Sequence, residues 1–209
     1  MNKPQAFLFD LDGVLIDSEG GYSEFWGEMN RRFAPHEPDL ARRIKGTTLP
    51  SILSTYFPDA AVQAEIRRLL SEYEDHMPYT LYPGTLDALR ELRSRGICRA
   101  IVTSSGRAKM DRLLDALPEL NMLIDVLVTD EDVSRSKPDP EPYLKAADLL
   151  GADPRKCVVV EDSLNGLRSG RAAGAYVVGI ATTNPREAIA PLSDAVVDTV
   201  ADVCTVLDK

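Results

Sequence analysis

The sequence predicts an α/β protein in which a Rossmann-like parallel sheet core carries an inserted α-helical cap domain. Short apolar runs rich in Val, Ile, Leu and Ala recur along the chain, and segments with a helical pattern separate most of them. This alternation is typical of a parallel sheet with helices on both faces. Between the first two runs, however, lie about eighty residues whose apolar positions follow a helical spacing without a convincing strand. This segment predicts the inserted helical cap.

Five apolar runs are expected to form the strands of the core, at residues 7–9, 100–102, 126–128, 158–160 and 176–180. Each is short and rich in residues that favour strands, as expected for strands buried on both faces of a parallel sheet. A helix is expected over residues 86–95, and Gly96 should end it.

The helical cap is placed at residues 18–79, so that residues 1–17 and 80–209 together form the catalytic core. Pro78, Pro83 and Gly84 mark the return of the chain to the core. Apolar residues at helical spacing predict the first cap helix: Tyr22, Phe25, Trp26, Met29 and Phe33. Tyr22 and Trp26 could either pack inside the cap or face a substrate, and the sequence leaves both alternatives open.

Composition and charge restrict the classes of partner. The chain has 209 residues, 44% of them hydrophobic, with a net charge of -9. This acidic balance argues against a nucleic-acid or anionic-membrane partner, but a small phosphorylated metabolite needs only a local basic patch. Residues 1–5 show no signal segment and no apolar run could span a bilayer, so we expect a cytoplasmic protein. No apolar seam indicates an oligomer, and we expect a monomer or a weak homodimer. The cysteines, odd in number and widely spaced, are expected to be reduced core residues: Cys98, Cys157 and Cys204.

Polar side chains follow four of the five expected strands. Asp10 and Asp12 come after the first strand, and as residues i and i+2 they should leave it on the same side. Gly13 then permits a sharp turn or the close approach of a ligand. The other three strands are followed by residues 103–107 (TSSGR), 136–138 (SKP) and 161–163 (EDS). Since the carboxyl ends of parallel strands meet at one edge of a sheet, these residues should gather in one crevice.

Such a crevice would hold an excess of negative charge. Carboxylates about 4 Å apart repel each other by roughly 4 kcal/mol at an effective dielectric constant near 20, so the cluster requires cations. Lys137 supplies one positive charge. A metal ion would balance the remaining negative charge, and oxygen ligands without a nearby His or Cys favour Mg²⁺. Carboxylates, Mg²⁺ and a lysine around one point indicate phosphoryl transfer. The hydroxyl and backbone N–H groups of Thr103 and Ser104, at the start of a helix, would hold phosphate oxygens.

At these positions the chain resembles the haloacid dehalogenase superfamily, in particular its phosphatases with a helical cap after the first strand, the group of β-phosphoglucomutase and phosphoglycolate phosphatase. The resemblance covers nearly the whole chain. It rests on four motifs in the family's order and spacing: FLFDLDGVLIDSE, AIVTSSGR, SKPDPEPY and VVVEDSLNGLRSGRAAG.

The resemblance implies roles for four residues of the core. Asp10 would be the nucleophile that forms an aspartyl-phosphate. Asp12 would protonate the leaving group and then deprotonate water. Thr103 would bind phosphate, and Lys137 would bridge phosphate and nucleophile.

The resemblance also implies the metal ligands. Mg²⁺ would bind the Asp10 carboxylate, the Asp12 backbone carbonyl and Asp162, while Glu161 would assist directly or through water. The dehalogenase branch lacks this second aspartate and the metal, so halide removal is disfavoured.

Substrate contacts are expected from both parts of the chain. In the cap, the polar turn containing Lys45 and Gly46 is the first candidate, although nearby Arg42 and Arg43 could equally form a solvated face. The remaining candidates are residues at the strand ends and at positions where relatives contact substrate: Gly13, Ser104, Ser105, Arg107 and Glu19.

The predicted activity is Mg²⁺-dependent hydrolysis of a small phosphorylated metabolite, such as a sugar phosphate. A β-phosphoglucomutase-like mutase is the alternative within the family. Its sugar mutases carry a His on the first cap helix where this chain has Tyr22, which disfavours that activity. A non-catalytic phosphometabolite sensor is a more distant alternative, because Asp10 and Asp12 are both intact.

Overall fold

The protein has a six-stranded parallel sheet, as seen in a computed structural model that describes residues 3–208. The strand order is β3-β2-β1-β4-β5-β6. The strands are β1 Ala6–Phe9, β2 Cys98–Val102, β3 Val126–Val128, β4 Cys157–Glu161, β5 Tyr176–Ile180 and β6 Ala195–Val197. The five predicted runs are confirmed as β1 to β5. β6 was not predicted, because only two short helical segments, of four and three residues, separate it from β5, so the alternation of strand and helix is weak there.

Helices cover both faces of this sheet, as predicted. One face packs against α5 (Thr85–Ser94), α6 (Arg107–Ala116), α7 (Pro118–Leu123) and the C-terminal 3₁₀ segment η4 (Val200–Asp208). The other packs against α8 (Glu141–Leu149), α9 (Leu164–Ala172) and α10 (Arg186–Ile189). Alternate residues of β1 face opposite sides: Phe7 and Phe9 join the first core, whereas Ala6 and Leu8 join the second. Short 3₁₀ segments complete the core: η1 (Asp130–Asp132), η2 (Pro154–Lys156) and η3 (Ala190–Leu192).

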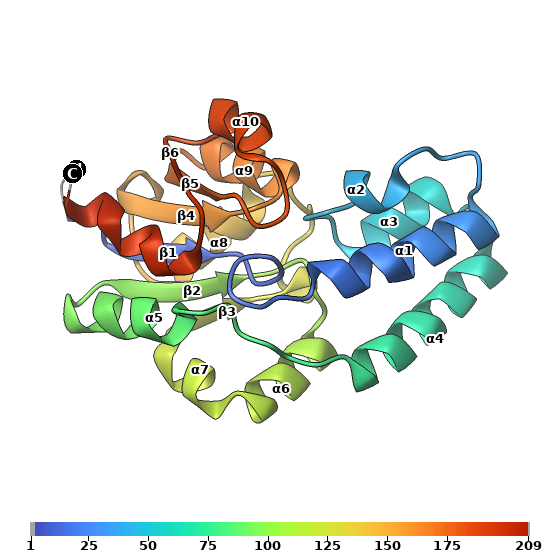
Figure 1. Cartoon of the computed structure of the whole chain (residues 1–209), viewed down its shortest axis with the longest axis horizontal. Coiled ribbons are helices and arrows are strands. Elements are labelled where there is room, and N and C mark those ends of the chain that lie inside the picture. The colour runs from blue at the N-terminus through green and yellow to red at the C-terminus, as the bar shows by residue number, and fades with distance from the viewer. Residues whose placement is uncertain (1–2, 209) are drawn as a thin grey trace.

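Four helices lie between β1 and α5 in the chain: α1 (Glu19–Phe33), α2 (Leu40–Arg43), α3 (Leu49–Tyr56) and α4 (Ala60–His76). They group together beyond the ends of β2 and β4 (Figure 1). They share a hydrophobic cluster of their own, with Trp26, Met29, Phe57 and Ile66 among its buried members. The Asp59 carboxylate caps α4 by accepting a hydrogen bond from the backbone N–H of Ala61 at 2.7 Å.

The cysteines within residues 3–208 form no disulfide, and Cys157 and Cys204 are buried as predicted, while Cys98 is only half-buried. Among residues 3–208, no helix combines the length and apolar character needed to cross a membrane.

Candidate active site

A cavity of about 450 Å³ lies between the carboxyl ends of the strands and the four helices α1 to α4. Residues from the loops after β1, β2 and β4 form its floor, including Asp10, Asp12, Thr103 and Asp162. Residues of the helices and their connections form the opposite wall, including Trp26, Lys45 and Leu70. The cavity thus gathers predicted residues from the loops after β1, β2 and β4, whereas its described lining does not include Gly13 or residues 136–138.

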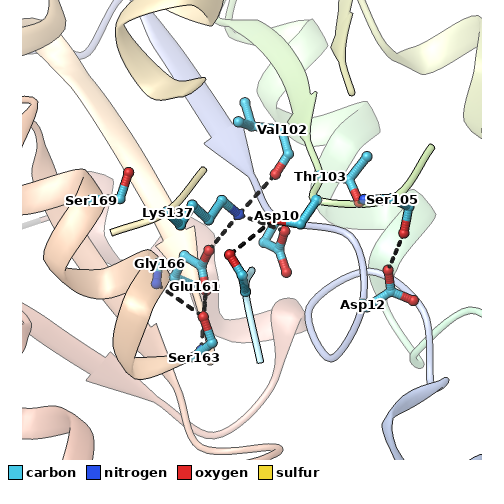
Figure 2. Close-up of polar contacts among 12 residues, drawn as sticks. Asp10, Asp12, Val102, Thr103, Ser105, Lys137, Glu161, Ser163, Gly166 and Ser169 are labelled. Carbon is cyan, nitrogen blue, oxygen red and sulfur yellow. Dashed lines mark hydrogen bonds and ion pairs between the residues drawn. The ribbon is translucent and has the colours of Figure 1, made fainter. Parts of the chain in front are cut away.

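Lys137 joins the loop after β3 to the ends of β1 and β4. Its Nζ donates to Asp10 Oδ1 at 2.7 Å, to Glu161 Oε1 at 2.7 Å and to the Val102 carbonyl at 3.0 Å (Figure 2). Although burial opposes the charge on this amine, the adjacent carboxylates Asp10 and Glu161 raise the pKa of Lys137 above its usual value. Lys137 is therefore a buried ammonium that holds Asp10 in place.

Glu161 is engaged on both oxygens by the protein. Oε1 accepts from Lys137 and from the Tyr143 hydroxyl at 2.8 Å, while Oε2 accepts from the Ser163 hydroxyl at 3.0 Å. Helix α9 packs directly against this side chain, because a Cβ on Gly166 would lie 1.7 Å from Glu161 Oε1. Glu161 thus organises Lys137 and the start of α9.

Asp162 differs from Glu161 in the hydrogen bonding of its carboxylate. Both of its carboxylate oxygens are buried, and neither has a hydrogen-bond partner among the described residues. Burial, together with the negative charges of Glu161, Glu19 and Asp10, raises the pKa of Asp162 well above its ordinary value. Gly13 permits its close approach: at a φ of 82°, a Cβ there would lie 2.3 Å from Asp162 Oδ2.

Oxygen atoms of Asp10, Glu161 and Asp162 lie within 4.8 Å of one another. Burial raises the pKa of Asp10 to about 7, with Lys137 opposing the shift and Glu161 adding to it. A buried set of oxygen donors with an unpartnered carboxylate suits a hard divalent cation such as Mg²⁺, whose charge would lower these pKa values. The residues present therefore fit the predicted metal.

Asp12 lies apart from this cluster, on the side of Ser105 (Figure 2). It accepts from the Ser18 hydroxyl at 2.5 Å, from the Ser105 hydroxyl at 3.1 Å and from Lys109 Nζ, which is 2.7 Å from both carboxylate oxygens. Burial alone would raise the pKa of Asp12, but Lys109 and the serine hydroxyls hold it below its ordinary value. Asp12 is thus stabilised as a carboxylate.

Lys109 was not predicted as a site residue. It lies two positions beyond the TSSGR motif, on the buried face of α6 beside Met110 and Leu113. A lysine on the apolar face of a helix that follows a strand-end motif was the available signal, because a buried ammonium requires a partner.

The loop after β2 corrects one detail of the prediction. Helix α6 begins at Arg107 with Gly106 as its cap, so Thr103 and Ser104 lie in an irregular loop and not at a helix start. The Thr103 backbone N–H donates to the Val128 carbonyl at 2.9 Å. Thr103 is therefore left with its buried hydroxyl, which accepts from the Ser105 N–H at 3.0 Å.

Arg107 is not brought to the cavity. Its side chain is exposed and pairs with Asp132 at 3.1 Å, and the described residues that line the cavity do not include it. Its backbone N–H donates to the Glu131 carboxylate at 2.8 Å.

The predicted cap contacts do reach the cavity. Glu19, Lys45 and Gly46 line it, and the Lys45 ammonium pairs with the Glu19 carboxylate. The Gly46 carbonyl accepts from the Ser104 hydroxyl at 2.9 Å, which joins the α2–α3 connection to the β2 loop. Nearby Arg42 and Arg43 are exposed and pair with Asp39 and Glu37, which favours the solvated alternative for them.

Tyr22 and Trp26 both pack among the helices α1 to α4 and face the cavity, so the two alternatives for them apply together. Each lines the cavity, and each also belongs to the hydrophobic cluster of α1 to α4, with Trp26 only 7% exposed. The Tyr22 hydroxyl donates to Glu74 Oε1 at 2.8 Å.

The chain is similar to known proteins over most of its length. A family model for haloacid dehalogenase-like hydrolases matches residues 4–174. Hexitol phosphatase A of Escherichia coli (strain K12) is 36% identical over 182 residues, covering 84% of this chain and 82% of that protein. Validoxylamine A 7'-phosphate phosphatase of Streptomyces hygroscopicus subsp. limoneus is 33% identical over 190 residues, 88% of each chain.

A solved structure is also similar over almost its whole length. The HAD family hydrolase of Deinococcus radiodurans R1, with bound phosphate and sodium, has a TM-score of 0.74 and 26% sequence identity, covering 99% of this chain and 96% of that one.

Proposed function

Because this chain belongs to the haloacid dehalogenase-like hydrolase family, we propose that it is a Mg²⁺-dependent phosphatase that acts on a small phosphorylated metabolite through an aspartyl-phosphate. One observation carries the proposal: the Asp10 carboxylate is held by the buried Lys137 ammonium next to Asp162, whose oxygens have no protein partner within the described chain. Helices α1 to α4 would serve as the cap at residues 18–79.

Asp10 would act as the nucleophile. A carboxylate oxygen of Asp10 bonds to phosphorus as the bond from phosphorus to the ester oxygen breaks. Lys137, fixed between Asp10 and Glu161, would balance negative charge where the phosphoryl group is transferred. The hydroxyls of Thr103, Ser104 and Ser105 would help to hold the phosphate.

Asp12 would act first as the general acid and then as the general base. Because Asp12 is a carboxylate in the free site, it would take up a proton when the substrate binds, and in that acid form it gives the proton to the departing ester oxygen, which leaves as an alcohol. The resulting carboxylate then takes a proton from the water that attacks the aspartyl-phosphate, which releases inorganic phosphate and restores Asp10.

The metal would be held by the carboxylates of Asp10 and Asp162 and by the backbone carbonyl of Asp12, with Glu161 behind them. Bound there, Mg²⁺ would supply positive charge that neutralises the phosphoryl oxygens.

Charges in the cavity indicate the rest of the substrate. The described lining residues include three cations, of which Lys45 is paired with Glu19 and Lys109 with Asp12, while Arg67 is exposed. Glu74, Asp130 and Glu131 add negative charge. A second anionic group would meet few available cations, which favours a neutral, hydroxyl-bearing body. Hexitol phosphatase A is named for the phosphate of such a polyol, which supports the proposal, and the other relative is named for the phosphate of validoxylamine A. The same charges disfavour a mutase that handles a bisphosphate.

A matched pair of esters tests this assignment. Glucitol 6-phosphate and 6-phosphogluconate differ at one end, where an alcohol is replaced by a carboxylate. We expect Mg²⁺-dependent phosphate release with kcat/KM at least about tenfold higher for glucitol 6-phosphate, a difference of about 1.4 kcal/mol. Preference for the carboxylate, or ligand-induced thermal shifts without any turnover, would contradict the proposed substrate or the proposed activity, respectively.

A further inference from the structure

Lys109 is a buried amine to which the reaction described above gives no role. Its side chain is 0% exposed, although it also borders the cavity. Nζ lies 2.7 Å from Asp12 Oδ1, 2.7 Å from Asp12 Oδ2 and 3.0 Å from the Ser105 hydroxyl oxygen. The ring of Tyr22, from α1, lies over the same ammonium at 4.7 Å.

These contacts account for all the donors of the ammonium. A lysine ammonium has three N–H groups, and here three oxygens surround it within hydrogen-bond distance. Its remaining side is covered by the Tyr22 ring. Lys109 therefore has no donor left for a substrate oxygen, and any effect it has on the reaction must pass through the groups it holds, Asp12 by two contacts and Ser105 by one.

The arrangement restricts how the Asp12 carboxylate can rotate. One ammonium contacts both carboxylate oxygens, while Ser18 fixes Oδ1 and Ser105 fixes Oδ2 from other directions. Ser18 precedes α1 and Lys109 lies in α6, so the holding groups come from separate elements. Of these groups, Lys109 alone carries charge and spans both oxygens.

We propose that Lys109 is a positioning residue that sets the orientation in which Asp12 meets the ester oxygen of the substrate. This inference rests on the proposed function, in which Asp12 serves as acid and base. It is distinct from the role of Lys137, which contacts the nucleophile side of the site and not Asp12.

How much a misplaced Asp12 slows hydrolysis depends on the leaving group of the substrate. An alkyl phosphate releases a basic alkoxide, which needs the proton of a correctly placed acid. p-Nitrophenyl phosphate releases a stabilised phenolate, which needs little protonation. Loss of orientation at Asp12 therefore slows the alkyl ester far more than the aryl ester, whereas general damage to the site slows both equally.

The test compares kcat/KM for glucitol 6-phosphate and p-nitrophenyl phosphate in the wild type and in Lys109→Met, with Mg²⁺ present. We expect the ratio of the two kcat/KM values, alkyl over aryl, to fall at least about tenfold. Lys156→Met is the matched control, because this exposed lysine precedes β4 at the end of the strand opposite Glu161. The control should leave the ratio unchanged.

An unchanged ratio in folded Lys109→Met, with both esters slowed alike or with only KM raised, would overturn the inference. If circular dichroism shows that Lys109→Met does not fold, Lys109→Gln, which is uncharged and shorter, provides the same comparison with an expected fall of about threefold, and an unchanged ratio there overturns it equally. Should the wild type hydrolyse neither ester, the proposed function itself fails and the inference falls with it.

Discussion

Two sides of the cavity use the same pair of side chains, a carboxylate and a lysine, to opposite effect. The nucleophile side (Asp10, Lys137, Glu161 and Asp162) crowds carboxylates around one ammonium, and burial raises the pKa of Asp10 to about 7. On the acid–base side (Asp12, Ser18, Ser105 and Lys109), one carboxylate has a cation and two hydroxyls, and its pKa is lowered despite burial. Each side contains a lysine, so the lysine does not distinguish them. On the nucleophile side several carboxylates share one cation, whereas on the acid–base side several donors surround one carboxylate.

Removing Lys137 should lower the free energy of unfolding more than removing Lys109. Lys137→Met leaves Asp10 and Glu161, whose side chains are 9% and 0% exposed, without their shared cation. We expect a loss of about 3–5 kcal/mol in the free energy of unfolding. Lys109→Met leaves Asp12 with its two hydroxyl donors, so about 1–3 kcal/mol is expected. Urea denaturation in EDTA measures both, and equal losses would contradict the distinction.

Magnesium should stabilise the protein through the nucleophile side. At about 100 times Kd, a bound ion adds about 2.7 kcal/mol to the free energy of unfolding. For a chain of this size, that corresponds to a rise in Tm of about 5–10 °C. Asp162→Asn should remove most of this rise, whereas Asp12→Asn should retain it, because only a backbone carbonyl of Asp12 is proposed as a ligand. Differential scanning fluorimetry checks this, and an equal loss in both variants would count against the ligand assignment.

The two sides should also differ in the pH dependence of stability. The folded pKa of Asp10 lies above the unfolded value, so its contribution to stability is present below about pH 4 and is lost as the pH rises toward 7. The folded pKa of Asp12 lies below the unfolded value, so its contribution is present above about pH 4 and is lost as the pH falls.

In metal-free buffer, the difference in Tm between Asp10→Asn and the wild type should therefore become more positive from pH 5 to pH 8. For Asp12→Asn, the change in Tm should be negative at both pH values, with most of its pH dependence below pH 5. Shifts of the same sign in both variants between pH 5 and pH 8 would show that the two carboxylates share one environment.

Arg107 lies on neither side and should have the smallest effect. Its exposed pairing with Asp132 is worth little in water, so Arg107→Ala should change the free energy of unfolding by less than about 0.5 kcal/mol. We expect kcat/KM to stay within about twofold of the wild type. A loss of tenfold or more in steady-state assays would place Arg107 in the substrate site after all.

The sequence predicted the sheet well because strands buried on both faces appear as continuous apolar runs, and their order brings the polar residues that follow them to one edge. Asp10, Lys137 and Asp162 were therefore expected close together, and in the structure Asp10 contacts Lys137 and has a carboxylate oxygen within 4.8 Å of one of Asp162. β6 was not predicted, although β3 is an equally short edge strand, because only the short segments α10 and η3 lie between β5 and β6 and the alternation of strand and helix is weak there.

Side-chain direction was less predictable. The TSSGR motif suggested a helix start at Thr103, but α6 begins only at Arg107, which points the arginine toward Asp132 instead of the cavity. Lys109 was not predicted because it lies on the buried face of α6, whereas the motifs that predicted the site lie in the loops at the strand ends. Its partner Asp12 lies 97 residues away in the chain, and local sequence patterns do not report such a contact.

The central claim is that Asp10 is phosphorylated during turnover. Rapid acid quenching with glucitol 6-phosphate and Mg²⁺, followed by digestion and mass spectrometry, tests it most directly. We expect a phosphate on the peptide that contains Asp10, removable by hydroxylamine, and both the phosphate and the turnover should be absent in Asp10→Asn. Phosphate release that continues in Asp10→Asn, or a phosphate found on another residue, would contradict the account.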